Sequence, residues 1–190
     1  ATKPFGFMKF TPGPGLGGHC IPIDPYYLSW KLKTLDYDAR FIKLAGEINT
    51  HMPRHVVELI ISSLNEYKKP IKGSKILIIG AAYKKDIDDC RESPALDIIQ
   101  ILNELGSDIN YFDPYVHQIN YGGLKYIGLA DLNENIISQF DATVIVTDHS
   151  NIDYDLIDAH SKLIVDTRNV YGNSENKSNI IRLGESPTIR

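Results

Sequence analysis

A cysteine that follows a glycine- and proline-rich stretch is the first candidate for chemistry in this sequence. Cys20 comes directly after the stretch 11–19 and just before Asp24-Pro25, a pair typical of a helix start. A helix N-terminus favours the thiolate form of a cysteine, and glycines let a ligand come close to the backbone. We therefore interpret Cys20 as a candidate nucleophile, with a buried structural cysteine as the alternative. Asp24 is both a candidate N-cap residue and a group that could orient a water molecule.

The glycine spacing matches a dinucleotide-binding pattern, but its surroundings do not. Gly13, Gly15 and Gly18 fit G-x-G-x-x-G, a motif that needs a strand before it and a helix that opens at its third glycine. Prolines stand within the stretch and shortly after it, at Pro12, Pro14, Pro22 and Pro25. Because they prevent a helix from starting there, we reject an NAD fingerprint. A loop that contacts a ligand and a tight surface turn both remain open.

A second candidate site follows the apolar run at 75–80, which we predict to be a strand buried on both faces. The loop after it, residues 81–94, contains Lys84 and Arg91, and Arg168 follows another predicted strand. Ligands of open parallel sheets bind beyond the carboxyl ends of the strands, and these cations suit a phosphate. The alternatives are a solvated charged loop and a surface arginine.

The histidines do not indicate a metal site. His51 and His55 lie four residues apart on a predicted helix, but Met52 stands where a zinc-protease motif has glutamate, and no third ligand is near. The sequence also has no C-x-x-C, G-x-S-x-G or P-loop motif. We therefore predict a surface histidine pair and no metal.

Strands and helices alternate in the second part of the chain. Apolar runs at 75–80, 108–113, 142–147 and 162–166 predict strands, and a shorter one lies near 126–127. Ser93-Pro94 opens and Gly106 closes one predicted helix, and another is expected over 129–138. This alternation is typical of an α/β fold with a Rossmann-like parallel sheet.

Helical spacing dominates the first part. A short helix is predicted over 25–33 and a long one over 39–67, where Pro53 should kink the helix or restart it. The long helix has one apolar stripe, made of Phe41, Leu44, Ile48, Met52, Val56, Ile60 and Leu64. The stripe packs either on its own domain or against another helix or subunit. We predict a helical segment over 1–70 and a Rossmann-like domain over 71–190.

Length and composition bound the class of protein. The chain has 190 residues, a net charge of −4 and 43% hydrophobic residues, which is typical of a globular protein and gives no basic surface for nucleic acid. No apolar run reaches the roughly 20 residues of a membrane helix. Two cysteines make no disulfide framework, so we expect a reducing cytoplasm.

Three segments together resemble the UDP-glucose/GDP-mannose dehydrogenase family, over about residues 1–171. They are PGPGLGGHCIPIDP at 12–25, GAAYKKDIDDCRESP at 80–94 and DTRN at 166–169. Residues 21–30 and 40–49 look most like the UDP-N-acetylglucosamine 6-dehydrogenase branch. The resemblance implies a central, dimerising helical segment and a UDP-sugar-binding domain, in a cytoplasmic NAD-dependent homodimer of polysaccharide biosynthesis. Since the family's N-terminal NAD domain and catalytic lysine are absent, we expect a C-terminal fragment that is inactive alone.

The resemblance also implies roles for single positions. Cys20 would add to a C6 aldehyde as a thiohemiacetal, a second oxidation would give a thioester, and water oriented by Asp24 would release the carboxylate. The implied substrate-binding residues are Thr11, Pro12, Gly13, Pro14, Gly15, Leu16, Gly17, Tyr83, Lys84 and Arg168. The implied NAD-contacting residues are Cys20, Ile21, Pro22, Ile23 and Arg91. His19 stands where some relatives have serine.

Other interpretations remain open. A non-catalytic module for UDP-sugar binding or oligomerisation would keep the fold without the chemistry. A thiol acyltransferase would need a base such as His19 or His149 beside Cys20. The sequence does not fix the sugar, because UDP-glucose, UDP-N-acetylglucosamine and UDP-N-acetylmannosamine differ at C2 and its substituent.

Overall fold

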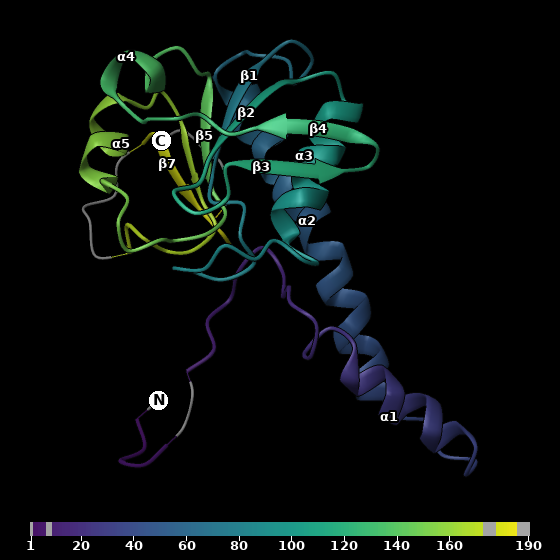
Figure 1. Cartoon of the computed structure of the whole chain (residues 1–190). Coiled ribbons are helices and arrows are strands. Elements are labelled where there is room, and N and C mark those ends of the chain that lie inside the picture. The colour runs from purple at the N-terminus through teal and green to yellow at the C-terminus, as the bar shows by residue number, and fades with distance from the viewer. Residues whose placement is uncertain (1, 7–8, 173–177, 186–190) are drawn as a thin grey trace.

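The computed structural model describes residues 2–6, 9–172 and 178–185, which form an α/β body and a helical arm that projects from it (Figure 1). Five parallel strands make the central sheet of the body, in the order β2-β1-β5-β6-β7. Their bounds are β1 Lys75–Ile79, β2 Asp108–Phe112, β5 Ala142–Ile145, β6 Ile164–Asp166 and β7 Ile180–Arg182. The predicted α/β fold with a Rossmann-like parallel sheet is confirmed.

Helices cover both faces of the sheet. Successive strand residues point to opposite faces, so Ile76 and Ile78 join the core formed with α2 (Arg40–Glu66) and α3 (Pro94–Glu104). Leu77 and Ile79 join the other core, with α4 (Glu134–Ile137) and α5 (Tyr154–His160). Because neither face is left to solvent, the strands are continuous apolar runs rather than alternating ones.

The order of the strands reverses between β1 and β5. From β1 the chain moves outward to β2 on one side, and β5, β6 and β7 follow on the other side. In open α/β sheets, ligands bind outside the carboxyl ends of the strands at such a switch point. The loops that start there are residues 80–93 after β1, 146–153 after β5 and 167–172 after β6.

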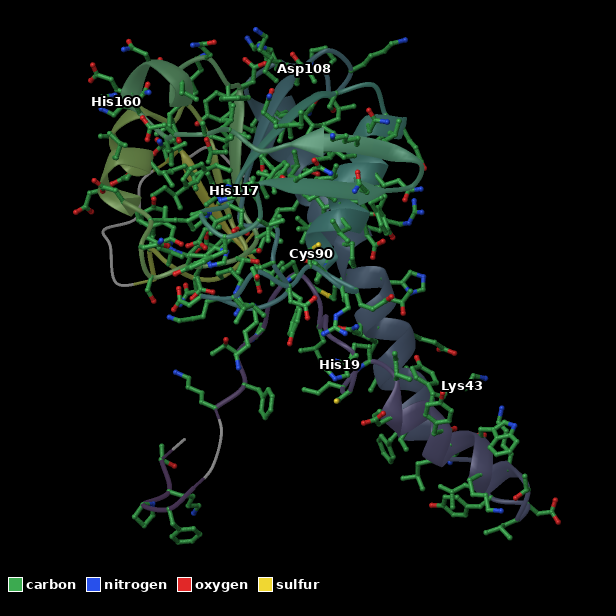
Figure 2. All side chains as sticks on the ribbon, in the orientation of Figure 1. His19, Lys43, Cys90, Asp108, His117 and His160 are labelled. Carbon is green, nitrogen blue, oxygen red and sulfur yellow. The ribbon has the colours of Figure 1, made fainter. Side chains whose placement is uncertain are left out.

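Helix α2 is one continuous helix with Pro53 inside it, so the predicted restart at this residue is wrong. Its apolar stripe lies in two environments. Val56, Ile60 and Leu64 are buried in the body, whereas Phe41, Leu44 and Ile48 are 88%, 52% and 56% exposed. We call α1 (Asp24–Lys33) together with residues 40–52 of α2 the arm; Lys43 is labelled on it in Figure 2.

Several short elements of the body differ from the prediction. Helix α4 is much shorter than the predicted 129–138, because the Asn133 side chain accepts a hydrogen bond from the Ile136 N–H and so caps the helix late. Ahead of it, Leu129 N–H donates to Tyr111 O beside β2. The short apolar piece near 126–127 lies in β4 (Leu124–Ile127), but its pairing in a hairpin with β3 (Gln118–Tyr121) was not predicted, and neither were helix α5 and β7. These elements are too short to give a clear periodic pattern.

The helices of the described residues include none that is both long enough and apolar enough to cross a membrane. The division into 1–70 and 71–190 stays a prediction. Residues 1, 7–8, 173–177 and 186–190 of those two parts lie outside the described residues.

Candidate functional site

The glycine-rich loop, residues 11–19, packs against the loop that follows β1. A Cβ on Gly17 would lie 2.5 Å from Tyr83 Cβ and 2.6 Å from Glu92 O, and Gly18 lies against the Tyr83 ring with a φ of +85°. The Gly18 N–H also donates to Arg91 O over 3.0 Å. Only glycine allows both this conformation and this approach. Two sequence-predicted segments, 60 or more residues apart in the chain, therefore meet.

Arg168 reaches the same glycine-rich loop from the end of β6. Its Nε donates to Asp148 Oδ1 over 3.0 Å, and a Cβ on Gly13 would lie 2.5 Å from its Nη1. The Arg168 N–H donates to Asp166 Oδ1 over 3.0 Å, which fixes the turn that presents the side chain. The predicted positions at 13, 17, 83 and 168 thus lie along one edge of the sheet.

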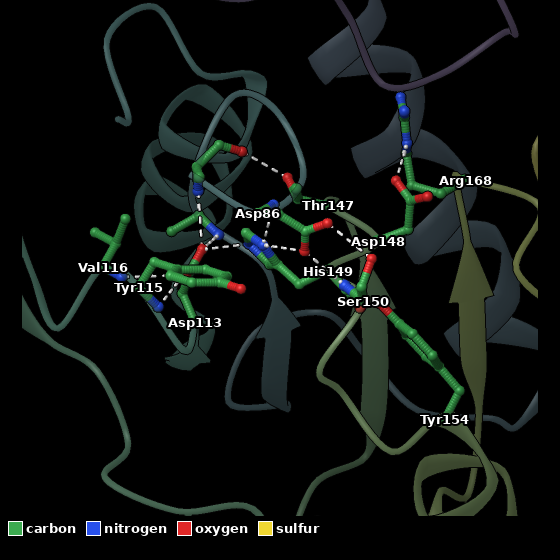
Figure 3. A network of polar contacts seen from close by, with 12 residues as sticks. Asp86, Asp113, Tyr115, Val116, Thr147, Asp148, His149, Ser150, Tyr154 and Arg168 are labelled. Atoms are coloured by element: carbon green, nitrogen blue, oxygen red, sulfur yellow. Dashed lines mark hydrogen bonds and ion pairs between the residues drawn. The ribbon is translucent and has the colours of Figure 1, made fainter. Parts of the chain in front are cut away.

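A buried carboxylate that the sequence did not single out holds the base of the loop after β1. Asp113 Oδ2 accepts hydrogen bonds from the N–H groups of Ala81 and Ala82 over 2.6 and 2.9 Å (Figure 3). Its Oδ1 accepts from Tyr115 and Val116 N–H over 2.8 and 3.0 Å. Burial pushes its pKa up, but these bonds and one from His149 outweigh burial and lower the pKa to about 2.

His149 connects Asp113 to the far part of the same loop. Its Nε2 lies 2.9 Å from Asp113 Oδ2, and its Nδ1 lies 2.9 Å from the Asp86 N–H (Figure 3). Because the backbone N–H can only donate, Nδ1 must accept, and the ring is neutral with its proton on Nε2. Both ring nitrogens are used, so the alternative of His149 as a base for Cys20 is wrong.

The other two predicted cations are exposed. Lys84 lies in the loop after β1, and its side chain is exposed. Arg91 donates from Nη2 to Asp89 Oδ2 over 2.5 Å and from Nε to both carboxylate oxygens. Hydrogen bonds from the Arg91 side chain and N–H lower the pKa of Asp89, and the same pair raises the pKa of Arg91. The Arg91 side chain as a whole is 63% exposed, so solvent or a ligand can still reach it.

Cys20 lies on the surface of the loop that leads into the arm. Its side chain is exposed, so the alternative of a buried structural cysteine is wrong. Its carbonyl oxygen accepts from the N–H groups of Ile23 and Asp24, which places the thiol one turn before α1. The N-cap residue is Ile23, and Asp24 is the first residue of the helix, so the predicted N-cap role of Asp24 is wrong. Its carboxylate is exposed and not used for capping.

A groove of about 650 Å³ separates the loop around Cys20 from α2 and the start of α3. Apolar side chains dominate its walls, with Ile21 and Ile23 from the loop and Phe41 from α2. Asn49, inside the segment 40–49, crosses the groove floor: its Oδ1 accepts from Leu16 N–H over 2.7 Å, which ties the glycine-rich loop to the arm. The groove adjoins the predicted positions 15, 16 and 21–23, whereas Tyr83, Lys84 and Arg168 lie outside its walls.

The residues predicted to touch NAD form an exposed edge. Ile21 and Ile23 are 52% and 40% exposed, and the Arg91 guanidinium is free on one side. A dinucleotide site needs a tight turn from strand into helix, whereas residues 80–93 separate β1 from α3. The described residues therefore fit an edge contact with NAD, and the sheet carries no dinucleotide turn after β1.

The predicted absence of a metal site is not contradicted by geometry. Within the described ranges, no group of three or more histidine, cysteine, aspartate or glutamate side chains could hold a metal ion. His51 is exposed, and its Nδ1 lies 2.7 Å from Glu47 O on the same helix.

Sequence comparison identifies both parts of the chain. Residues 77–173 match the UDP binding domain of the UDP-glucose/GDP-mannose dehydrogenase family, and residues 1–51 match its central domain. A protein of Methanococcus maripaludis named UDP-N-acetyl-D-mannosamine dehydrogenase is 40% identical over 168 residues, which is 84% of this chain and 36% of that protein. An NDP-N-acetyl-D-galactosaminuronic acid dehydrogenase of Ralstonia nicotianae is 31% identical over 165 residues, again 84% of this chain and 36% of the relative.

Solved structures agree with the sequence matches. The UDP-D-ManNAc dehydrogenase of Pyrococcus horikoshii superposes with a TM-score of 0.75 and 31% identity, over 94% of this chain and 41% of that structure. The NDP-N-acetyl-D-galactosaminuronic acid dehydrogenase of Methanosarcina mazei gives 0.74 and 28% identity, over 92% and 39%. The chain thus spans little more than a third of the length of such relatives.

Proposed function

This chain belongs to the UDP-glucose/GDP-mannose dehydrogenase family, and we propose that it holds the UDP-sugar and supplies the cysteine of an NAD-dependent UDP-sugar 6-dehydrogenase. The observation that carries the proposal is the meeting of the glycine-rich loop with Tyr83 and Arg168 at the carboxyl ends of the strands. Such an edge is where open parallel sheets bind ligands. The backbone of the glycine-rich loop, which a ligand can approach closely, and the Arg168 guanidinium both suit a diphosphate.

Two cations flank the proposed diphosphate position. Arg168 is oriented by Asp148, which takes its Nε and leaves the other guanidinium nitrogens toward the glycine-rich loop. Lys84 is exposed on the loop after β1 and has no ion-pair partner among the described residues. We assign Thr11 to Gly17, Tyr83, Lys84 and Arg168 to the UDP-sugar.

Cys20 is the proposed nucleophile. Once the C6 alcohol has become an aldehyde, the thiolate adds to the aldehyde carbon, and the resulting thiohemiacetal loses a hydride to become a thioester. Water then attacks the thioester carbon, and the acid leaves as the thiol is restored. The exposure of the thiol supports this role, as does the apolar groove lined by the next three residues, Ile21 to Ile23. The exposed Asp24 carboxylate, one turn away, is the proposed water-orienting group.

NAD, when bound, accepts the hydride in each of the two oxidations. The residues of this chain proposed to touch it are Cys20 to Ile23 and Arg91, as an edge contact. Their proposed part is to bind NAD, and the side chains of the two isoleucines exclude water from that contact.

The sugar is proposed to be a UDP-N-acetylhexosamine. The relatives named for UDP-N-acetyl-D-mannosamine make that epimer the first candidate, and the resemblance of residues 21–30 and 40–49 supports UDP-N-acetylglucosamine. Turnover by the complete gene product with each UDP-sugar in turn decides between them. A preference for UDP-glucose would contradict the acetylated class.

A homodimer is proposed to form through the arm. Its exposed apolar side chains are Tyr27, Leu28, Trp30, Phe41, Leu44 and Ile48, a larger apolar surface than a monomer usually leaves in water. Sedimentation of the chain should give a dimer, and Leu44→Glu with Ile48→Glu should give a monomer with an unchanged far-ultraviolet spectrum. A monomeric wild type would contradict the proposal.

The catalytic proposal is tested by Cys20→Ala in the complete enzyme. Oxidation to the acid should fall by at least about a thousandfold, because the covalent step is lost, while UDP affinity measured by calorimetry changes less than about twofold. Cys90→Ala is the matched control, since this half-buried thiol is assigned no part in the chemistry. If Cys20→Ala keeps its activity but wild type binds UDP, the alternative of a binding module is favoured for this chain.

A further inference from the structure

Three residues of the loop after β1 lie between two residues, Ala82 and Asp86, whose main chains are fixed by hydrogen bonds. Ala82 N–H donates to Asp113 Oδ2, and Ala82 O accepts from Thr147 Oγ1 over 2.6 Å. Four residues later, Asp86 N–H donates to His149 Nδ1. The intervening residues are Tyr83, whose own N–H donates to Asp89 O over 3.0 Å, and Lys84 and Lys85, which among the described residues are held only through the two anchors on either side.

The second anchor holds a residue whose backbone lies in a less favoured conformation. Asp86 has a φ of +62°, in the left-handed region that costs energy for residues other than glycine. Ser150 N–H and Oγ donate to the Asp86 carboxylate over 2.8 and 2.7 Å, and they lower its pKa. His149 holds the main chain and Ser150 the side chain of this one residue (Figure 3).

The chemistry at position 149 demands one acceptor and one donor on opposite sides of a buried side chain. His149 is fully buried, and so is the Asp113 carboxylate. Neutral imidazole in the Nε2–H form supplies both groups, whereas a protonated ring would have no acceptor for the Asp86 N–H. Breaking either bond would leave a buried polar group unpaired.

We propose that His149 is a positioning residue of the nucleotide site: its Nδ1 holds Asp86 and thereby fixes the stretch of backbone that carries Lys84, a proposed contact of the anionic ligand. The identity of that ligand as UDP rests on the proposed function. The contact itself is a property of the loop and is testable without any nucleotide.

Two substitutions separate the two bonds. In His149→Asn, the amide oxygen stands near the position of Nδ1 and can accept from Asp86, but the donor to Asp113 is lost. In His149→Gln, the longer amide can donate to Asp113, but the acceptor for Asp86 is lost. Measured by calorimetry, the Kd of the chain for UDP should rise about tenfold in His149→Gln and about twofold in His149→Asn.

The matched control lies at the other end of β5. Ser161 Oγ and Thr143 Oγ1 form a buried polar pair 2.9 Å apart. Ser161→Ala removes a bond of the same kind, so it should lower stability to denaturant comparably and leave the Kd for UDP unchanged. If UDP affinity follows stability across all three variants, or if His149→Asn loses at least as much affinity as His149→Gln, the proposal is overturned.

A nucleotide-free measurement keeps this test apart from the proposed function. In ¹⁵N spectra of the wild-type chain, His149 should show one pyrrole-like and one pyridine-like ring nitrogen. The amide signals of residues 83–86 should move in His149→Gln more than in His149→Asn. If the wild type fails to bind UDP but these signals behave as stated, the proposed function fails and the positioning role stands. If the amides do not respond to His149→Gln, the positioning role fails whatever binds.

Discussion

The carboxyl edge of the sheet and the arm differ in how far their side chains are buried. At the sheet edge, Asp113 and His149 are fully buried, and each of their polar atoms has a hydrogen-bond partner. On the arm, apolar side chains such as Phe41 and Ile48 stand more than half exposed. The polar network at the edge is therefore satisfied within the chain, whereas the arm leaves large apolar side chains exposed to solvent. The same helix, α2, belongs to both regions, so the contrast can be measured on it directly.

Matched isoleucines on α2 give the largest expected difference. Ile60 is fully buried in the core of the body, and Ile48 is 56% exposed on the arm. Ile60→Ala should lower the free energy of unfolding by about 4 kcal/mol, because it removes buried hydrocarbon and leaves a cavity. Measured at a protein concentration at which the chain is monomeric, Ile48→Ala should change it by less than about 0.5 kcal/mol. Urea unfolding of the two variants checks the prediction, and equal losses would show that the arm is as well packed as the body.

Substitution of a glycine at the sheet edge should give the second largest loss of stability. Gly80 ends β1 with a φ of +85°, and a Cβ there would lie 2.5 Å from both Thr147 Cβ and Thr147 O. Gly80→Ala should cost about 3 kcal/mol from backbone strain and overlap together. Gly73→Ala is the control, since its φ is also positive, +80°, but nothing lies within 4 Å of its Cβ. Thermal unfolding of both should therefore separate overlap from strain, and equal shifts would contradict a crowded edge.

The free energy of unfolding at acid pH should depend on the ionisation of the buried Asp113 carboxylate. Folding lowers the pKa of Asp113 from its ordinary value of 3.8 to about 2, because the hydrogen bonds to its carboxylate outweigh burial. A carboxyl whose pKa is lowered on folding stabilises the fold above its unfolded pKa and loses that contribution as pH falls toward the folded pKa. About 2 kcal/mol should therefore disappear between about pH 4 and pH 2. Urea midpoints across this range should fall more steeply for wild type than for Asp113→Asn.

An exposed carboxylate at the start of β2, the strand that Asp113 follows, serves as the control for that titration. Asp108 begins β2 at the surface. Asp108→Asn should leave the wild-type steepness in place. If Asp113→Asn and wild type lose stability in parallel, Asp113 does not carry the acid dependence.

The sequence was informative where a residue's neighbours in the chain decide its role. Ser93-Pro94 predicts the start of α3 because the cap is local: the Ser93 side chain accepts from Ala95 N–H. The glycine-rich loop and the loop after β1 were identified as motifs, and the rule for parallel sheets predicted that the loop after β1 and Arg168 share one edge.

Roles that depend on distant partners could not be read from the sequence. Asp113 and His149 are 36 residues apart, and nothing in their local pattern indicates that both bind the loop after β1. Asn49 is similar, since its partner Leu16 lies 33 residues away. The apolar stripe of α2 predicted one buried face, but periodicity does not say where along a helix the neighbouring structure ends. The contrast between edge and arm is thus a property of tertiary contacts.

The smallest expected effect on global stability comes from a glycine on the arm. Gly46 lies directly beneath the Tyr26 hydroxyl of α1, so that an added Cβ would overlap it. Gly46→Ala should displace Tyr26 and loosen α1, while alanine favours the helix by about 1 kcal/mol over glycine. The two effects nearly cancel, so the free energy of unfolding should change by less than about 0.5 kcal/mol. Hydrogen exchange of the α1 amides should nevertheless quicken, and that of the β1 amides should not, because the arm can open without the body.

A double mutant decides whether the Tyr26 contact is the cause. Tyr26→Ala alone should quicken exchange in α1 by about as much as Gly46→Ala, and the two together should add little, since both remove one shared contact. Additive effects would mean that α1 is held on α2 by other side chains. Exchange that quickens in β1 as well would mean that arm and body unfold as one unit, and the comparison between them would then fail.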